Sequence, residues 1–300
     1  MRFSHGNRAT VRLSLDEAER LLAKGPHPER ARRDADLLLL HVLKKEAPET
    51  NQAWLIAHPS DSLAADAAVA FCELIDRRLA GEPIQYITGE AEFYGLPFHV
   101  NREVLIPRPE TEHLVEKVIA LAQRLRLTWA PNPRIVDVGT GSGAIAVSLA
   151  HALPFAEITA TDISAAALAV AKSNAARIGS ADRVRFFDGD LLEPVVSEHF
   201  DIVVSNPPYV PDSDRVALDV EVRDYEPAQA LFAGEDGLAI YRRLIPVALD
   251  ALVPGGFVAL EIGYGQCEAI RALLAGAGFS GVEFTEDLQR IPRVAVAQRG

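Results

Sequence analysis

The sequence predicts an α/β protein in which a parallel-sheet domain follows a small helical bundle. After residue 134, apolar runs of strand length alternate with segments of helical periodicity, as they do in parallel sheets. Between residues 12 and 80 the apolar positions recur at helical spacing. A glycine-rich turn over 139–143 joins an expected strand to a helix, which is typical of sites for nucleotide-like ligands.

The expected bundle contains three helices. Ser14 and Glu17 fit the N-cap and N3 positions of a capping box, so the first helix should begin after Ser14. Gly25 and the proline after it should end that helix. Two more helices are expected over 30–43 and 61–80, where apolar residues again recur at helical spacing.

The chain changes character near residue 85. Two short apolar runs over 92–100 are separated by Gly95-Leu96-Pro97, which predicts a hairpin. Pro107 and Pro109 favour an extended backbone, and Thr111 can cap a helix that runs to about residue 127. We therefore expect a helical domain, a hairpin with a linker, and the α/β domain over 1–85, 86–110 and 111–300.

The glycine-rich turn lies between the strand 134–138 and the helix 144–150. Alternate glycines allow a tight turn and a close approach of a ligand, and the helix N-terminus offers free N–H groups. The next strand, 157–161, ends at Asp162, whose carboxylate can accept hydrogen bonds from ribose hydroxyls. The alternative is an ordinary turn, with Asp162 or Ser164 capping the helix that follows.

A second motif, Asn206-Pro207-Pro208-Tyr209, follows the apolar strand 200–204. Two prolines remove two backbone donors, so the carbonyls here are free to point into a cleft. Asn206 can both donate and accept hydrogen bonds, and Tyr209 offers a flat ring. Together these groups could hold a planar NH2 group, although Asn-Pro also marks ordinary turns.

The remaining elements complete the alternation. A strand over 184–187 is followed by Asp188-Gly189-Asp190-Leu191. Pro254-Gly255-Gly256 should end a helix before the next strand. The later helices are expected over 238–252 and 266–277, and the later strands over 257–262, 281–285 and 293–298.

Composition excludes several classes of protein. The chain has 300 residues, 49% hydrophobic and 24% charged, which suits one large or two modest globular domains. No apolar run is long enough to cross a membrane and residues 1–5 open no signal peptide, so we expect a cytoplasmic protein without a membrane partner. Cys72 and Cys267 lack metal-ligand spacing, so reduced thiols and no metal are expected. The net charge of −12 argues against a stable nucleic-acid partner.

The spacing G-x-G-x-G differs from the dinucleotide fingerprint G-x-G-x-x-G. It resembles the first motif of Rossmann-like methyltransferases that use S-adenosylmethionine. This resemblance implies that the methionine moiety lies over the loop, with Asp137 near its ammonium group and Asp162 at the ribose. Near the adenine it implies Asp190 and Leu191. The loop residues assigned to the cofactor are Gly139, Thr140, Gly141, Ser142 and Gly143, together with Asn206.

Paired with the Asn-Pro-Pro-Tyr motif, the loop resembles methyltransferases that act on amino groups attached to sp² carbon. Among these, the chain is similar over nearly its whole length to the PrmC/HemK family of release factor glutamine-N5 methyltransferases. The similar segments are 81–89, 105–112, 137–143, 206–209, 226–227 and 231–234. The resemblance implies methylation of the glutamine of a Gly-Gly-Gln motif, a release factor as the partner, and a helical domain that binds this substrate.

The resemblance also assigns roles within the motif. Asn206, Pro207 and Tyr209 would be catalytic, and Pro208 would join them in contacting the substrate. Two other classes of protein compete with this interpretation. A nucleic-acid methyltransferase would normally carry a basic target-recognition region, which the sequence lacks. The second class is a binding protein that has lost catalysis. The presence together of Asp137, Asp162, the glycine loop and Asn206 argues against it.

Overall fold

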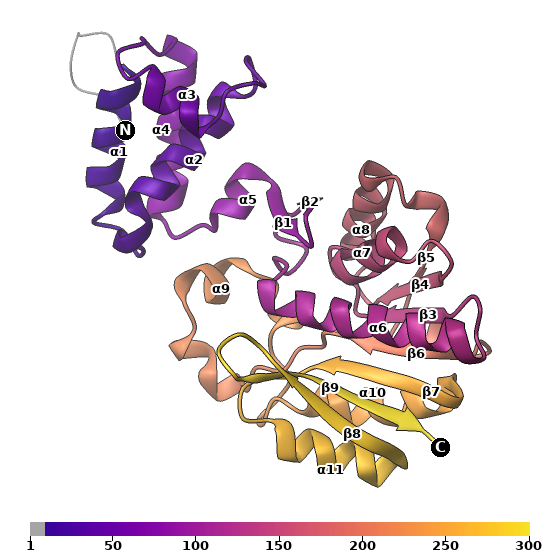
Figure 1. Ribbon diagram of the computed structural model, residues 1–300. Coiled ribbons are helices and arrows are strands. Elements are labelled where there is room, and N and C mark those ends of the chain that lie inside the picture. Colours follow the sequence, from indigo (N-terminus) through magenta and orange to yellow (C-terminus); the bar gives the residue numbers. More distant parts are fainter. Residues whose placement is uncertain (1–9) are drawn as a thin grey trace. The chain divides into compact units, whose positions relative to one another are not determined.

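The computed structural model describes residues 10–300 and divides the chain into two compact units (Figure 1). The smaller unit ends at Gly89 but also contains Asp219–Tyr225, and the larger unit contains Glu90–Leu218 and Glu226–Gly300. The expected absence of a signal peptide concerns residues 1–5, which lie outside the described residues. Within residues 10–300 no helix combines the length and the apolar character needed to cross a membrane.

The smaller unit is a bundle of helices around one apolar core, as predicted. The buried core includes Leu38, Phe71 and Ile75. The helices are α1 (Val11–Leu22), α2 (Ala31–Leu43), α3 (Gln52–Ala57), α4 (Ala65–Leu79), α5 (Ile84–Thr88) and, from much later in the chain, α9 (Val220–Tyr225). A short 3-10 helix, Pro28–Arg30, precedes α2.

Two boundaries in this unit differ from the prediction. The N-cap of α1 is Thr10, which accepts a hydrogen bond from the Leu13 N–H, and Ser14 is buried inside the helix. The capping box was therefore wrong, because Ser14 lies on the face that packs into the core. Helix α4 begins four residues later than expected, since Ser62 pairs with Thr10 in an isolated antiparallel bridge and keeps the preceding chain extended.

The larger unit is built on a seven-stranded sheet with the order β5-β4-β3-β6-β7-β9-β8. The first five strands in this order are parallel, and β9 runs antiparallel to both of its neighbours. The strands are β3 (Arg134–Val138), β4 (Glu157–Asp162), β5 (Val184–Asp188), β6 (Phe200–Ser205), β7 (Leu252–Glu261), β8 (Phe279–Glu286) and β9 (Pro292–Arg299).

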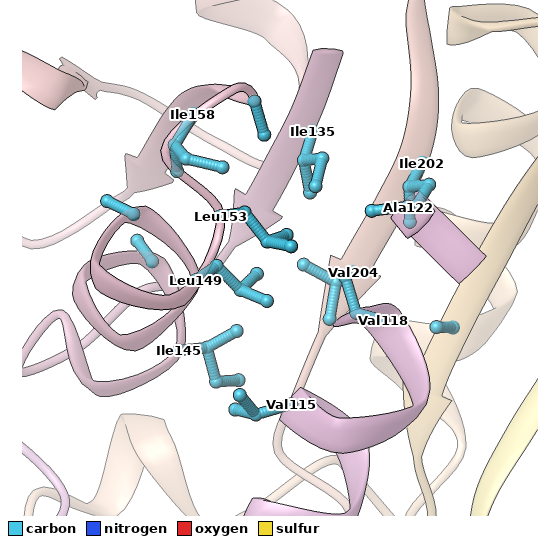
Figure 2. Close-up of a cluster of buried hydrophobic side chains, with 14 of the residues drawn as sticks. Val115, Val118, Ala122, Ile135, Ile145, Leu149, Leu153, Ile158, Ile202 and Val204 are labelled. Atoms are coloured by element: carbon cyan, nitrogen blue, oxygen red, sulfur yellow. The ribbon is translucent and has the colours of Figure 1, made fainter. Parts of the chain in front are cut away.

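Helices cover both faces of this sheet. The side chains of successive strand residues point to opposite faces, so Ile135 packs on one side and Val136 on the other. On the first face, α6 and α7 pack against β3, β4 and β6, as Figure 2 shows. On the second face lie α10 and α11. The helices are α6 (Glu112–Thr128), α7 (Ala144–Ala152), α8 (Ala165–Ile178), α10 (Ala239–Ala251) and α11 (Cys267–Ala277).

The hairpin was predicted correctly, but its turn was not. Strands β1 (Glu90–Phe93) and β2 (Leu96–His99) are joined by Tyr94-Gly95, and both turn residues have positive φ, as a tight primed turn requires. The chain was expected to divide at residue 85 with the hairpin in a linker. Instead Phe93 and Phe98 are fully buried in the core of the larger unit, so this unit begins at Glu90.

The segment Pro254-Gly255-Gly256 does not separate a helix from a strand. It lies inside β7, which begins at Leu252. The pairing with β6 jumps there, from Phe200 opposite Leu252 to Ile202 opposite Phe257. An irregularity of this kind lets a strand accept proline and glycine, because the ladder is already interrupted.

We predict that Phe98→Ala lowers the free energy of unfolding of the larger unit by about 3–5 kcal/mol, because it empties a buried aromatic site. The chain has two tryptophans, so a Trp54→Phe background leaves Trp129 to report urea unfolding of this unit. Leu127→Ala, at a residue 87% exposed, is the control and should change the value by less than about 0.5 kcal/mol. Equal stability of the two variants would contradict the placement of the hairpin.

Candidate active site

A cavity of about 330 Å³ opens at the carboxyl ends of the parallel strands. The chain proceeds from β3 to β4 on one side and returns to β6 on the other, so the strand order reverses between β3 and β6. Ligands of open α/β sheets bind at such a switch point. The lining comes from the turns after β3, β4, β5 and β6, from residues 103–111, and from residues 227–243, all in the larger unit.

The glycine-rich turn forms one wall of this cavity. Gly139 and Gly141 have φ of 74° and 56°, and a Cβ on either would meet no described atom within 4 Å. These two positions therefore need glycine for their backbone conformation and leave open space for a ligand. Gly143 does not line the cavity, and its Cβ would lie 3.1 Å from that of Ala171, so it allows α7 and α8 to pack closely.

Asp162 both lines the cavity and organises the loops around it. Its Oδ2 accepts a hydrogen bond from the Gly141 N–H at 2.8 Å, and its Oδ1 accepts one from the Ser164 N–H at 2.9 Å. Burial raises the pKa of this carboxyl. Ser164 caps α8, so the capping alternative is correct for Ser164. Each carboxylate oxygen of Asp162 has a further lone pair that can accept a hydrogen bond from a ligand hydroxyl.

Asp137 is fully buried and does not line the cavity. Its Oδ2 accepts hydrogen bonds from the Thr140 hydroxyl at 2.6 Å and from the Ala146 N–H at 3.2 Å, which anchor the loop to the start of α7. Burial raises the pKa of its carboxyl to about 7. Its Oδ1 has no hydrogen-bond partner in the described part of the chain, which is compatible with a neighbouring cation. The expected role beside an ammonium group stays a prediction.

The turn after β5 forms a further part of the wall. Asp190 and Leu191 both line the cavity. The Leu191 backbone has a φ of 51°, and its carbonyl accepts a hydrogen bond from the Thr161 hydroxyl at 2.7 Å. Asp190 pairs with Arg243. An aliphatic side chain at residue 191 offers packing rather than ring stacking to a planar ligand.

The Asn-Pro-Pro-Tyr motif lies directly beside the glycine loop. The Ser205 hydroxyl donates to the Val138 carbonyl at 2.7 Å and so joins the ends of β6 and β3. Asn206, Pro207 and Pro208 line the cavity, whereas Tyr209 does not. Tyr209 is held by Gln266, whose Nε2 donates to the Tyr209 carbonyl at 3.1 Å, and burial raises the pKa of the Tyr209 hydroxyl.

Two contacts of the site were missed by the sequence analysis. Thr111 was expected to cap a helix, but it makes no capping bond to α6; instead its Oγ1 accepts a hydrogen bond from Asn206 Nδ2 at 3.1 Å. Arg108 Nη2 donates to both carboxylate oxygens of the buried Glu226, at 2.7 and 2.8 Å. Both pairs join residues far apart in the sequence, so one sequence carries no signal for them.

The open space beside Gly139 and Gly141 and the Asp162 carboxylate that lines the cavity fit a ligand with a ribose, as S-adenosylmethionine has. The fold and the site together define an S-adenosylmethionine-dependent methyltransferase of the Rossmann-like class.

Comparison with known proteins gives the family. The model of the PrmC N-terminal domain matches residues 14–89, and that of the methyltransferase small domain matches residues 118–223. The release factor glutamine methyltransferase of Koribacter versatilis is 40% identical to this chain, over 97% of this chain and 99% of that protein. The release factor glutamine methyltransferase of Moorella thermoacetica is 46% identical, over 90% of this chain and 91% of that protein. The chain belongs to the release factor glutamine methyltransferase family, as the sequence motifs predicted.

Solved structures agree on the fold. The hMettl16 catalytic domain in complex with MAT2A 3′UTR hairpin 1 aligns with a TM-score of 0.57 at 20% identity, over 88% of this chain and 91% of that one. The Thermus thermophilus 16S rRNA N2 G1207 methyltransferase aligns with a TM-score of 0.51 at 20% identity, over 70% of this chain and 50% of that one. The predicted Rossmann-like fold is thereby confirmed.

We predict that Asp162→Ala weakens S-adenosylmethionine binding about tenfold to a hundredfold, because a hydrogen bond to a charged group contributes about 1.5–3 kcal/mol. Isothermal titration calorimetry measures this affinity directly. Asp188→Ala is the matched control, since Asp188 is an exposed acid at the end of β5 that does not line the cavity. An affinity in Asp162→Ala as high as in the control would contradict the role of Asp162.

Proposed function

We propose that this enzyme methylates the side-chain amide nitrogen of the glutamine in the Gly-Gly-Gln motif of release factors, with Asn206 holding that amide. One observation carries the assignment of Asn206. Its Nδ2 is occupied by Thr111, so its Oδ1 is the group left to accept a hydrogen bond from a substrate NH2. Pro207 and Pro208 carry no N–H, so the cavity wall beside Asn206 presents acceptors rather than donors.

The cofactor would be held by Gly139, Thr140, Gly141 and Ser142 on one side, and by Asp162, Asp190 and Leu191 on the other. When bound, S-adenosylmethionine supplies an electrophilic methyl group on a sulfonium sulfur. Asp137 and Gly143 would act from behind this surface, through the loop that they hold in place.

An amide nitrogen is a poor nucleophile because its lone pair is delocalised into the carbonyl. In this proposal the Asn206 Oδ1 and the Pro207 carbonyl oxygen accept hydrogen bonds from the two N–H groups of the substrate amide. These acceptors orient the nitrogen and stabilise the positive charge that develops on it in the transition state. Tyr209 does not line the cavity, so its expected packing against the amide plane stays a prediction. Such positioning can lower the activation free energy by on the order of 7–11 kcal/mol. After methyl transfer the nitrogen can lose its proton to water.

The helical unit is proposed to hold the release factor. Support comes from the chain path: residues 206–208 and 227–230 both contribute to the cavity wall, and between them the chain contributes α9 to the helical unit. The helical unit is therefore joined to both cavity segments directly through the polypeptide chain. Because the proposed substrate is a translation factor, the proposal also places the enzyme in the cytoplasm.

The test is transfer of labelled methyl groups from S-adenosylmethionine to a purified bacterial release factor, beside a variant with Gln→Ala in its Gly-Gly-Gln motif. Label on the unmodified factor alone supports the proposal. Label on DNA or RNA, with neither release factor labelled, would instead support the nucleic-acid class of substrate.

We predict that Asn206→Ala lowers kcat about 10²–10³-fold, the usual effect of removing one group that stabilises transition-state charge. Binding of S-adenosylmethionine by the same variant should change by less than about tenfold, a difference of ~1.4 kcal/mol. Single-turnover methylation and calorimetry on one preparation separate the two effects. If methyl transfer persists at the wild-type rate, Asn206 does not hold the substrate amide.

A further inference from the structure

The Asn-Pro-Pro-Tyr motif begins where the chain leaves the sheet, because β6 ends at Ser205. Pro207 and Pro208 have no N–H, so the backbone here cannot donate to a neighbouring segment at these residues. Beyond β6, the next backbone-to-backbone hydrogen bond along the described chain is made by Val210, whose N–H donates to the Leu231 carbonyl at 2.9 Å. The motif therefore lies in a stretch that the backbone hydrogen bonds of its neighbours do not hold.

The side chain of Gln266 supplies a hydrogen bond to this stretch. Its Nε2 donates to the Tyr209 carbonyl at 3.1 Å and to the Gly237 carbonyl at 3.4 Å. Its Oε1 accepts a hydrogen bond from the Gly263 N–H at 2.9 Å. Both ends of the amide are thus occupied. A half turn of the amide would place its oxygen against two carbonyl oxygens, so the contacts fix its orientation.

Two glycines make room for these contacts. A Cβ on Gly237 would lie 2.3 Å from the Tyr209 carbonyl oxygen. A Cβ on Gly263 would lie 2.9 Å from the Gln266 Oε1 and 3.0 Å from the Tyr209 Cδ2. The amide and the Tyr209 backbone can approach these turns only because both residues lack a side chain.

Gln266 is itself fixed by the sheet and by α11. The Ile262 N–H, at the end of β7, donates to the Arg293 carbonyl at 2.8 Å. The Gln266 N–H then donates to the Gly263 carbonyl at 3.2 Å and closes the turn that follows β7. The Gln266 carbonyl accepts from the Ile270 N–H of α11 at 2.9 Å. The strand next to β6 therefore carries a rigid support for the chain that leaves β6.

We propose that Gln266 is a positioning residue, which holds the Tyr209 backbone so that the acceptors on Asn206 and Pro207 stay aligned with the substrate NH2 group. This inference rests on the proposed function of Asn206. Neither Gln266 nor Tyr209 lines the cavity, so Gln266 acts on the reacting atoms only through the backbone of the motif. Displacement of that backbone should lower kcat, because the reaction depends on the alignment of the reacting groups.

The first test replaces the amide NH2 by an oxygen. Gln266→Glu has nearly the same shape, but its carboxylate opposes the carbonyl oxygens of Tyr209 and Gly237. Its kcat for release factor methylation should fall about tenfold to a hundredfold, with the KM for S-adenosylmethionine unchanged. Gln266→Met removes the hydrogen bonds without adding a charge and should lower kcat by a smaller factor.

Gln298→Glu is the matched control. Gln298 is also partly buried in the larger unit, and its Nε2 donates to the Gly255 carbonyl at 2.9 Å. Neither of these residues lines the cavity, so this variant makes the same chemical change away from the site and should keep the wild-type kcat. Urea unfolding of both variants shows that kcat is compared between folded proteins. A kcat of Gln266→Glu equal to that of the control would overturn the inference.

A second variant displaces the same carbonyl and leaves Gln266 in place. The Cβ added by Gly237→Ala collides with the Tyr209 carbonyl oxygen, so kcat should fall by a similar factor. Gly237 has a φ of 72°, which strains any other residue. Gly281→Ala is the control, since Gly281 has a φ of 62° and a Cβ there would meet no described atom within 4 Å. It adds the strain without the collision and should keep the wild-type kcat.

A third test does not depend on a release factor. In ¹⁵N-labelled protein the Asn206 side-chain NH2 signals, assigned by their absence in Asn206→Ala, should shift in Gln266→Glu and not in Gln298→Glu. A wild type that methylates release factors while Gln266→Glu and Gly237→Ala retain its kcat would overturn the inference and leave the proposed function standing. The same NMR shift in a protein whose wild type is inactive on release factors would support the positioning and refute the proposed function. If Gln266→Glu fails to fold, Gln266→Met and Gly237→Ala decide.

Discussion

The site depends on the parallel pairing of β3 with β6. The two strands leave the sheet at the same edge, and the Ser205 hydroxyl joins their ends by its bond to the Val138 carbonyl. One strand continues into the glycine loop and the other into Asn206. The cofactor wall and the proposed substrate amide site therefore share one rigid support, with helices packed on both faces of the sheet to fix it. Catalysis by positioning requires a rigid support of this kind, because small displacements of the reacting groups lower the reaction rate strongly.

Three carboxyl groups around this edge are removed from water to different extents. Burying a carboxylate is unfavourable unless hydrogen bonds replace its hydration. Asp162 accepts hydrogen bonds from two backbone N–H groups, Asp137 accepts them from a hydroxyl and one N–H group, and the Oε2 of Glu261 has no partner within residues 10–300. Burial raises the pKa of all three. The loops that define the cavity are thus ordered by acids that act as fixed acceptors for the segments around them.

The helical unit is also held together by a buried ionic contact. Arg78 is almost fully buried, donates to Asp34 at 2.6 Å and to the Glu82 carbonyl at 3.0 Å, and pairs with Glu221 of α9. The Tyr225 hydroxyl adds a bond to the Ala80 carbonyl at 2.9 Å. Because a buried charge left without its partner is strongly destabilising, these contacts commit the late segment Asp219–Tyr225 to the early helices.

The sequence by itself determined the features that short-range patterns encode. Strand and helix periodicity, the glycine turn and the Asn-Pro-Pro-Tyr motif were sufficient for the fold class, the family and most of the cavity wall, because these signals depend on neighbouring residues. Tertiary structure decided the choices that local rules leave open. Thr10 and Ser14 both satisfy an N-cap rule, and burial selected Thr10. Thr111 could cap a helix, and packing turned it toward Asn206. The pairing of Arg108 with Glu226 and the place of Asp219–Tyr225 in the helical unit follow from contacts between distant segments, whose energies no local pattern contains.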